Sequence, residues 1–154
     1  MRHGTEHVPR RVAGRRTGRP PRRRHEQAVT VVVMDGYVRS TGCDSRCSRA
    51  TQIYREQIAA LVQSRGWRLG RMFDESSLGV ALERIESRES DGLVVARVAH
   101  LGTTFAQVLD TIERIQAAQG RFVSVVDGLD LGTPSGRLVL RTLFSIGHPH
   151  HDGA

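Results

Sequence analysis

An arginine and a serine stand side by side where an apolar run of the chain ends, and this pair is the first candidate for chemistry. Residues 29–34 are mostly valine, which favours a strand buried on both faces of a parallel sheet. Arg39 and Ser40 then fall near the carboxyl end of that strand, where open α/β sheets collect their ligands. A serine hydroxyl beside a guanidinium is suited to nucleophilic attack on a phosphate. The alternative is that Ser40 and Thr41 form a turn or cap the next element.

The elements that must position this pair alternate along the chain. After the first strand, further strands are predicted at residues 67–73, 93–98 and 122–126, and helices at residues 49–65, 81–89, 105–118 and 136–146. This order predicts an α/β fold: a mainly parallel central sheet of four to five strands with helices on both faces. The sequence contains no glycine-rich phosphate loop and no dinucleotide-binding motif.

The positive charge of the chain is concentrated at its start. The 154 residues carry a net charge of +7, and residues 1–26 alone account for it, with nine arginines against Glu6 and Glu26. We therefore expect a disordered arginine-rich tail over residues 1–28, a folded domain over residues 29–146 and a second tail over residues 147–154. A basic arm of this kind holds DNA weakly and without sequence preference.

Three further features bear on cofactors and location. The two cysteines, Cys43 and Cys47, lack the second pair that a zinc site requires, so we expect a reduced cytoplasmic protein. No apolar run approaches the roughly 18 residues of a membrane helix, and we do not expect the protein to associate with a membrane. His148, His150, His151 and Asp152 suggest a metal site, but ligands need fixed surroundings, and a mobile tail is the better interpretation. No cofactor or metal is expected.

Five segments carry a resemblance to a known family. They are Gly36-Tyr37-Val38-Arg39-Ser40-Thr41, Gln57 to Trp67, Phe73-Asp74-Glu75-Ser76-Ser77, Asp91-Gly92-Leu93-Val94-Val95 followed by Leu101-Gly102, and Thr133-Pro134-Ser135-Gly136-Arg137. In this order and spacing they resemble the catalytic domain of the serine recombinases, the resolvase/invertase family. The resemblance spans the folded part of the chain, from about Gly36 to Ser145.

The resemblance implies a site-specific DNA recombinase, which cuts and rejoins DNA through a covalent phosphoserine link. By this resemblance Ser40 is the nucleophile, Arg39 binds the phosphate, and Gln57 helps to order the site. Arg84 is the nearest candidate for the arginine that follows the mobile loop of the family. The implied partners are DNA and either a second copy of the chain or a related recombinase subunit. Arginines supply the electrostatic stabilisation, so the resemblance implies no metal.

The sequence also departs from the family pattern at the site. The family nucleophile stands two residues after the arginine, whereas Ser40 is one residue after Arg39 and Thr41 holds the expected place. A shift of one residue turns a strand side chain to the opposite face, although a local bulge can restore it. The loop that supplies an aspartate and two arginines in the family reads Ala99, His100 and Thr103 here, and His100 is a cation only at low pH.

The final helix departs as well. In the family it continues for many turns and builds the dimer, whereas here the sequence Gly147-His148-Pro149 is expected to end it after residue 146. We therefore expect a C-terminally truncated domain with weakened dimerisation. Two alternatives to an active recombinase stay open: a catalytically degenerate remnant or accessory DNA- or protein-binding module of the same fold, and a phosphate- or nucleotide-binding signalling domain. The lack of a phosphate-binding glycine loop or an acidic cluster opposes the signalling domain.

Overall fold

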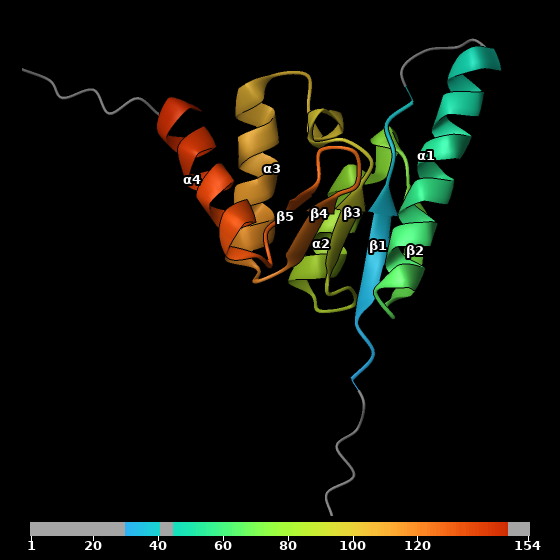
Figure 1. Ribbon diagram of the computed structural model, residues 1–154, viewed down its shortest axis with the longest axis horizontal. Helices are drawn as coiled ribbons and strands as arrows, with labels where there is room; N and C mark the ends of the chain where they lie inside the picture. The colour runs from blue at the N-terminus through green and yellow to red at the C-terminus, as the bar shows by residue number, and fades with distance from the viewer. Residues whose placement is uncertain (1–29, 41–44, 148–154) are drawn as a thin grey trace, which may run out of the picture.

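The computed structural model describes residues 30–40 and 45–147, which form a sheet with helices on both faces (Figure 1). The strands are β1 (Val33–Tyr37), β2 (Arg68–Phe73), β3 (Gly92–Val95), β4 (Arg121–Ser124) and β5 (Leu129–Asp130). The helices are α1 (Ser45–Ser64), α2 (Leu78–Glu86), α3 (Phe105–Ala117) and α4 (Pro134–Gly147), with short 3-10 turns η1 (Glu75–Ser77) and η2 (Val98–Leu101). The predicted α/β fold class is confirmed. The predicted tail of residues 1–28 lies outside the described residues, as does the tail predicted over residues 147–154 except Gly147, which is the last residue of α4.

The five strands are ordered β2-β1-β3-β4-β5, so the first strand of the chain lies inside the sheet. β1 pairs in parallel with β2 and β3, and β3 pairs in parallel with β4. β5 adds an antiparallel edge through two residues, with Val123 opposite Asp130 and Ser124 opposite Leu129. The sequence did not predict β5, because a two-residue strand is too short to show a periodicity.

The ladder between β1 and β2 contains an irregularity beside Asp35. Met34 pairs with Leu69, but Gly36 pairs with Met72, so β2 has one extra residue opposite Asp35. The Oδ1 atom of Asp35 accepts a hydrogen bond from the Arg71 backbone N–H at 2.8 Å. The Asp35 carboxylate thus takes the place of the backbone acceptor that the Arg71 N–H would otherwise have in a regular ladder.

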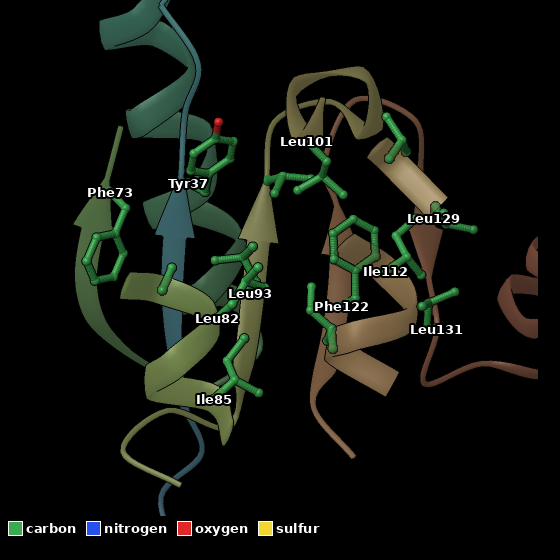
Figure 2. Close-up of a cluster of buried hydrophobic side chains, with 14 of the residues drawn as sticks. Tyr37, Phe73, Leu82, Ile85, Leu93, Leu101, Ile112, Phe122, Leu129 and Leu131 are labelled. Atoms are coloured by element: carbon green, nitrogen blue, oxygen red, sulfur yellow. The ribbon is translucent and has the colours of Figure 1, made fainter. Parts of the chain in front are cut away.

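Two apolar clusters cover the two faces of the sheet. The α1 face is filled by Met34, Val38, Ile58, Val62, Val94, Ala96 and Val123, all buried. The opposite face packs β-strand side chains against α2, α3 and the start of α4, as Figure 2 shows for ten labelled residues that include Tyr37, Leu82, Ile112 and Phe122. Successive residues of β1 and its extension therefore alternate between the two clusters: Tyr37 belongs to one and Val38 to the other.

Several boundaries differ from the sequence prediction. β1 starts at Val33 rather than at residue 29, and Val31 is exposed. The chain between the predicted strand 67–73 and the predicted helix 81–89 is already helical in part, because the Asp74 carboxylate accepts from the Ser76 N–H and caps η1. α2 consequently begins at Leu78 and ends at Glu86, where the following backbone turns and Arg88 adopts a φ of 66°.

Candidate functional site

A cavity of about 320 Å³ lies at the carboxyl edge of the sheet, where β1 ends and the turns η1 and η2 begin. It is lined by Tyr37, Arg39, Glu75, Leu78, His100, Leu101, Gly102, Thr103 and Gln107. Figure 2 shows the Tyr37 hydroxyl directed away from the core, toward this edge. The position agrees with the general rule that ligands of open α/β sheets bind beyond the carboxyl ends of the strands.

Arg39 is the cation that lines this cavity. Its guanidinium forms an ion pair with Glu75 of η1, with Nε 3.4 Å from Oε2. The Arg39 side chain is 26% exposed and that of Glu75 is 50% exposed, so the pair is partly screened by solvent. A stronger anionic ligand can therefore compete with Glu75 for the guanidinium at little cost.

Ser40 follows Arg39 but is not among the residues that line the cavity. The backbone of residues 38–40 continues from β1, and the Val38 N–H donates to the Phe73 carbonyl at 3.0 Å. Arg39 lines the cavity together with Tyr37, whereas Val38 between them packs toward α1, so these three side chains alternate in direction. Thr41, the other hydroxyl of this segment, lies outside the described residues.

Arg84 is engaged elsewhere in the fold. Its Nε donates to Oδ2 of Asp35 at 2.8 Å, and its Nη1 donates to Oε2 of Glu89 at 3.0 Å. These bonds, the Asp35 hydrogen bond above all, raise the pKa of Arg84, which stays cationic. Arg84 does not line the cavity, so the structure does not bring it together with Arg39.

Gln57 lies on α1 with an exposed side chain and does not line the cavity either. Of the four residues that the sequence assigns to a site, Arg39 alone belongs to the cavity wall. Ser40 lies next to it along the chain, and Gln57 and Arg84 lie on the helices of opposite faces of the sheet.

His100 occupies the floor of the cavity and is 8% exposed. The Nδ1 atom of His100 is buried and has no hydrogen-bond partner. It is the one buried side-chain nitrogen or oxygen atom of this kind among the described residues. Burial lowers the pKa of His100 below its usual 6.5, and the Arg97 and Arg39 cations lower it further, against a weaker opposite effect of Asp127. The imidazole is therefore neutral at physiological pH, and a positive charge on it requires acidic conditions.

Hydrogen bonds to neighbouring segments hold the turn η2, which carries His100. The Asp127 carboxylate accepts from the Val98 N–H at 2.7 Å and from the Ser124 hydroxyl at 2.5 Å. At the other end of the turn, the Thr104 hydroxyl caps α3 by accepting from the Gln107 N–H. Thus η2 is held at both ends while its histidine faces the cavity.

Sequence reasoning missed the partners of these residues. The local sequence does not identify the two carboxylates that pair with the arginines. Glu75 lies within one of the segments that carry the family resemblance, and Asp35 follows the valine-rich stretch. A single acidic residue inside a buried strand is itself a signal, because it demands a cation nearby. The identity of that cation, Arg84, follows only from the packing of α2 on β1.

Within residues 30–40 and 45–147, no helix is long and apolar enough to cross a membrane. The same part of the chain contains no group of three histidine, cysteine, aspartate or glutamate residues arranged to hold a metal ion. The C-terminal histidines lie outside it.

Comparison with solved structures identifies similar folds. The N-terminal catalytic domain of TP901-1 integrase is 16% identical with a TM-score of 0.65, and the match covers 75% of this chain and 93% of that one. A resolvase family site-specific recombinase from Streptococcus pneumoniae is 14% identical with a TM-score of 0.67, covering 75% and 85%. The C-terminal catalytic domain of ISC1926 TnpA, an IS607-like serine recombinase, is 10% identical with a TM-score of 0.54, covering 76% and 100%.

Sequence comparisons agree with the structural ones at the level of the family. No curated protein sequence matches the chain. Residues 34–148, which contain all five strands but the first residue of β1, match the family described as "Resolvase, N terminal domain". The segments that carry the resemblance in the sequence lie within this range. The chain therefore belongs to the resolvase family of serine recombinases, through their N-terminal domain.

Proposed function

We propose that the protein serves DNA recombination as a recombinase-type domain that binds a DNA backbone phosphate at the Arg39 cavity but has lost the cleavage step. The observation that carries the proposal is the position of Arg39, which lines a cavity at the carboxyl edge and has a half-exposed carboxylate as its partner. A phosphate is the anion that the family acts on, and a guanidinium binds phosphate oxygens with matching geometry.

Cleavage by a serine recombinase requires groups at the site that phosphate binding alone does not require. The serine oxygen forms a bond to phosphorus, the bond from phosphorus to one sugar oxygen breaks, and the hydroxyl proton leaves while that sugar oxygen gains one. Charge on the phosphate oxygens must be neutralised as this happens, and each missing donor typically costs about a hundred- to a thousand-fold in rate. In this chain Arg84 is bound to Asp35, and positions 99, 100 and 103 hold alanine, a neutral histidine and threonine.

An active recombinase with Ser40 as its nucleophile is the second candidate. It is favoured by one observation, the direct succession of Arg39 and Ser40 just after β1, an inner strand of the sheet. In this case Gln57 and Arg84 are proposed to assist the site, which requires both side chains to leave their present surroundings.

A covalent-trapping assay separates the two candidates. The protein and its Ser40→Ala variant are incubated with nicked and with supercoiled DNA, quenched in denaturant, and analysed for a protein–DNA adduct. We expect no adduct from either protein, with folding of both checked by circular dichroism. An adduct from the wild type that Ser40→Ala abolishes would establish the active recombinase and overturn the loss of cleavage.

DNA is the proposed macromolecular partner, and residues 1–28 are proposed to supply most of the non-specific attraction. Their arginines release counterions when they contact phosphates, so affinity should fall steeply with salt. Deleting residues 1–28 should remove most of this salt dependence, as measured by fluorescence anisotropy of a labelled duplex. An unchanged salt slope would assign the attraction to the folded domain instead.

A second copy of the chain, or a related recombinase subunit, is the other proposed partner. Helix α4 exposes Leu138 by 64% and Ile146 by 66%, which suits association through this helix. α4 spans only 14 residues, so the association should be weak. Light scattering over a concentration series, with Leu138→Glu as the disrupting variant, tests it.

A further inference from the structure

The amino edge of the sheet, opposite the Arg39 cavity, carries a second group of arginines. Because β1, β2, β3 and β4 run parallel, their first residues share this edge. Trp67 directly precedes β2, Arg121 begins β4, and Arg65 directly follows α1. The guanidinium carbon of Arg65 lies 5.0 Å from the centroid of the Trp67 ring, and that of Arg121 lies 5.8 Å from it. We call these three residues the Trp67 surface.

The packing of the sheet brings the Trp67 surface together on the side of α1. Trp67 packs against the apolar cluster of the α1 face, to which the buried Val123 also belongs. Arg121 stands two residues before Val123 on β4, so strand alternation directs it to the same face. The Arg121 N–H donates to the Asp91 carbonyl at 2.8 Å, which fixes the backbone that carries this side chain.

The two guanidiniums of the Trp67 surface differ in their partners. Arg65 donates from Nη1 to the Asp130 carboxylate. Arg121 is exposed, and within the described part of the chain its side chain has no ion pair and no hydrogen bond. The Asp91 carboxylate, also at this edge, accepts from the Val33 N–H at 2.7 Å. The ring contact occupies the guanidinium face, so the in-plane N–H donors of Arg121 remain available. Arg121 is therefore an oriented cation with unused donors.

The arginine-rich start of the chain joins the domain at this same edge. Figure 1 shows the described chain entering β1 at the tail of its arrow, and residues 1–29 precede that point. Val32, just before β1, packs against the same apolar cluster as Trp67. Residues 1–26 contain nine arginines and two glutamates. A polyanion bound by those arginines is thereby tethered near the Trp67 surface, which raises its effective concentration there.

We propose that the Trp67 surface binds the phosphate backbone of DNA through Arg121, as a continuation of the contacts that residues 1–28 make. This inference rests on the proposed DNA partner and adds a binding surface at the edge of the sheet opposite the cavity. A guanidinium matches the geometry of phosphate oxygens, and its contact with the Trp67 ring reduces the freedom that Arg121 loses on binding. A contact with the backbone carries no sequence information, so binding here is independent of DNA sequence.

The first measurement uses Trp67 itself, which is the only tryptophan of the chain and therefore reports on this surface alone. The full chain is titrated with duplex DNA of unrelated sequence, and quenching of the tryptophan fluorescence by acrylamide is followed. Acrylamide is uncharged, so the quenching does not alter the ionic strength. We expect bound DNA to reduce the quenching, because the phosphate backbone then covers the Trp67 surface.

The second measurement tests Arg121 by fluorescence anisotropy of a labelled duplex. Arg121→Gln should weaken binding about three- to tenfold and reduce the slope of log affinity against log salt by about one, the effect of one phosphate contact. Arg121→Lys keeps the positive charge and should keep the slope. Arg141→Gln makes the same charge change on the exposed face of α4 and should leave the affinity and the slope unchanged.

The outcomes separate failure of this inference from failure of the proposed DNA partner. If the duplex binds but Trp67 is quenched as before, the Trp67 surface is wrong and the DNA partner stands. Equal effects of Arg121→Gln and Arg141→Gln lead to the same conclusion. If the wild type does not bind the duplex, both proposals are wrong. Circular dichroism checks the fold of each variant, and the quenching measurement on the wild type needs no variant.

Discussion

Arg84 donates from Nε to Oδ2 of Asp35 at 2.8 Å, and Asp35 is completely buried in the inner strand β1. The second carboxylate oxygen of Asp35 accepts from the Arg71 N–H within the bulge of β2. One carboxylate therefore connects α2, β1 and β2. The same relationship explains why an arginine that the sequence suggests for phosphate binding lies away from the cavity.

Replacing Arg84 should destabilise the fold. Arg84→Met leaves the buried Asp35 carboxylate without its cation, which costs about 3 kcal/mol in the free energy of unfolding. The double variant Asp35→Leu/Arg84→Met should recover most of this loss, since neither charge then remains buried. Urea unfolding followed by circular dichroism measures both. Arg141→Met, on the exposed face of α4, is the matched control and should be neutral. Wild-type stability of Arg84→Met would contradict the structural role.

Two glycines offer a paired test of the space around Asp35. A Cβ added at Gly70 would overlap Oδ1 of Asp35, so Gly70→Ala must displace the buried carboxylate and should cost on the order of 1–3 kcal/mol. A Cβ at Gly79, in the first turn of α2, meets nothing within 4 Å, and Gly79→Ala should stabilise the protein by up to about 1 kcal/mol. Thermal unfolding compares them. Equal effects of the two substitutions would show that the carboxylate is free to move.

The unpartnered imidazole should make stability depend on pH. Because burial lowers the pKa of His100 in the folded state, the unfolded state binds the proton first as the pH falls below 6.5. Stability contributed by the neutral imidazole is therefore complete above 6.5 and declines on acidification until the lower folded-state pKa is passed. His100→Phe should abolish this part of the decline and raise the unfolding free energy at pH 7 by about 1 kcal/mol. Parallel pH profiles of the two proteins, from urea unfolding between pH 5 and 8, would contradict it.

Removing the carboxylate that pairs with Arg39 should strengthen anion binding. Glu75→Gln releases the guanidinium and eliminates a negative charge from the cavity wall, so affinity for sulfate should rise about two- to fivefold, in line with the small energy of a solvent-screened pair. Sulfate suits this titration because its charge is constant near neutral pH. Glu83→Gln makes the same charge change on α2, outside the residues that line the cavity. An equal gain in both variants would indicate a general charge effect.

The sequence predicted the fold class because each main element carries a strong local pattern. The apolar run of residues 93–96 and the periodic face of α3 specify a strand and a helix by themselves, whereas only Val33 and Met34 of the valine-rich stretch 29–34 lie in β1. β5 escaped prediction because its pairing with β4 is tertiary, fixed by the approach of α4. Gly136 permits that approach, since a Cβ there would overlap the Asp130 carbonyl.

The site was less predictable than the fold. Arg39 could be placed at the carboxyl edge because its strand was recognisable, and Ser40, one residue short of the family position, does not line the cavity. The partner of Arg84 depends on the rotation of α2 over β1, and the burial of His100 depends on the path of η2, neither of which a local pattern encodes.

The inner position of β1 has a consequence for synthesis on the ribosome. β1 leaves the exit tunnel before the rest of the domain, yet its two neighbours, β2 and β3, begin 31 and 55 residues after its own last residue, Tyr37. Neither ladder of this strand can form until those segments have been translated. The nascent chain therefore presents an apolar strand with two unpaired edges for several seconds, at elongation rates of about 5–20 residues per second. We expect chaperones to bind the nascent chain during this interval, because both edges of β1 stay unpaired until β2 and β3 have been synthesised.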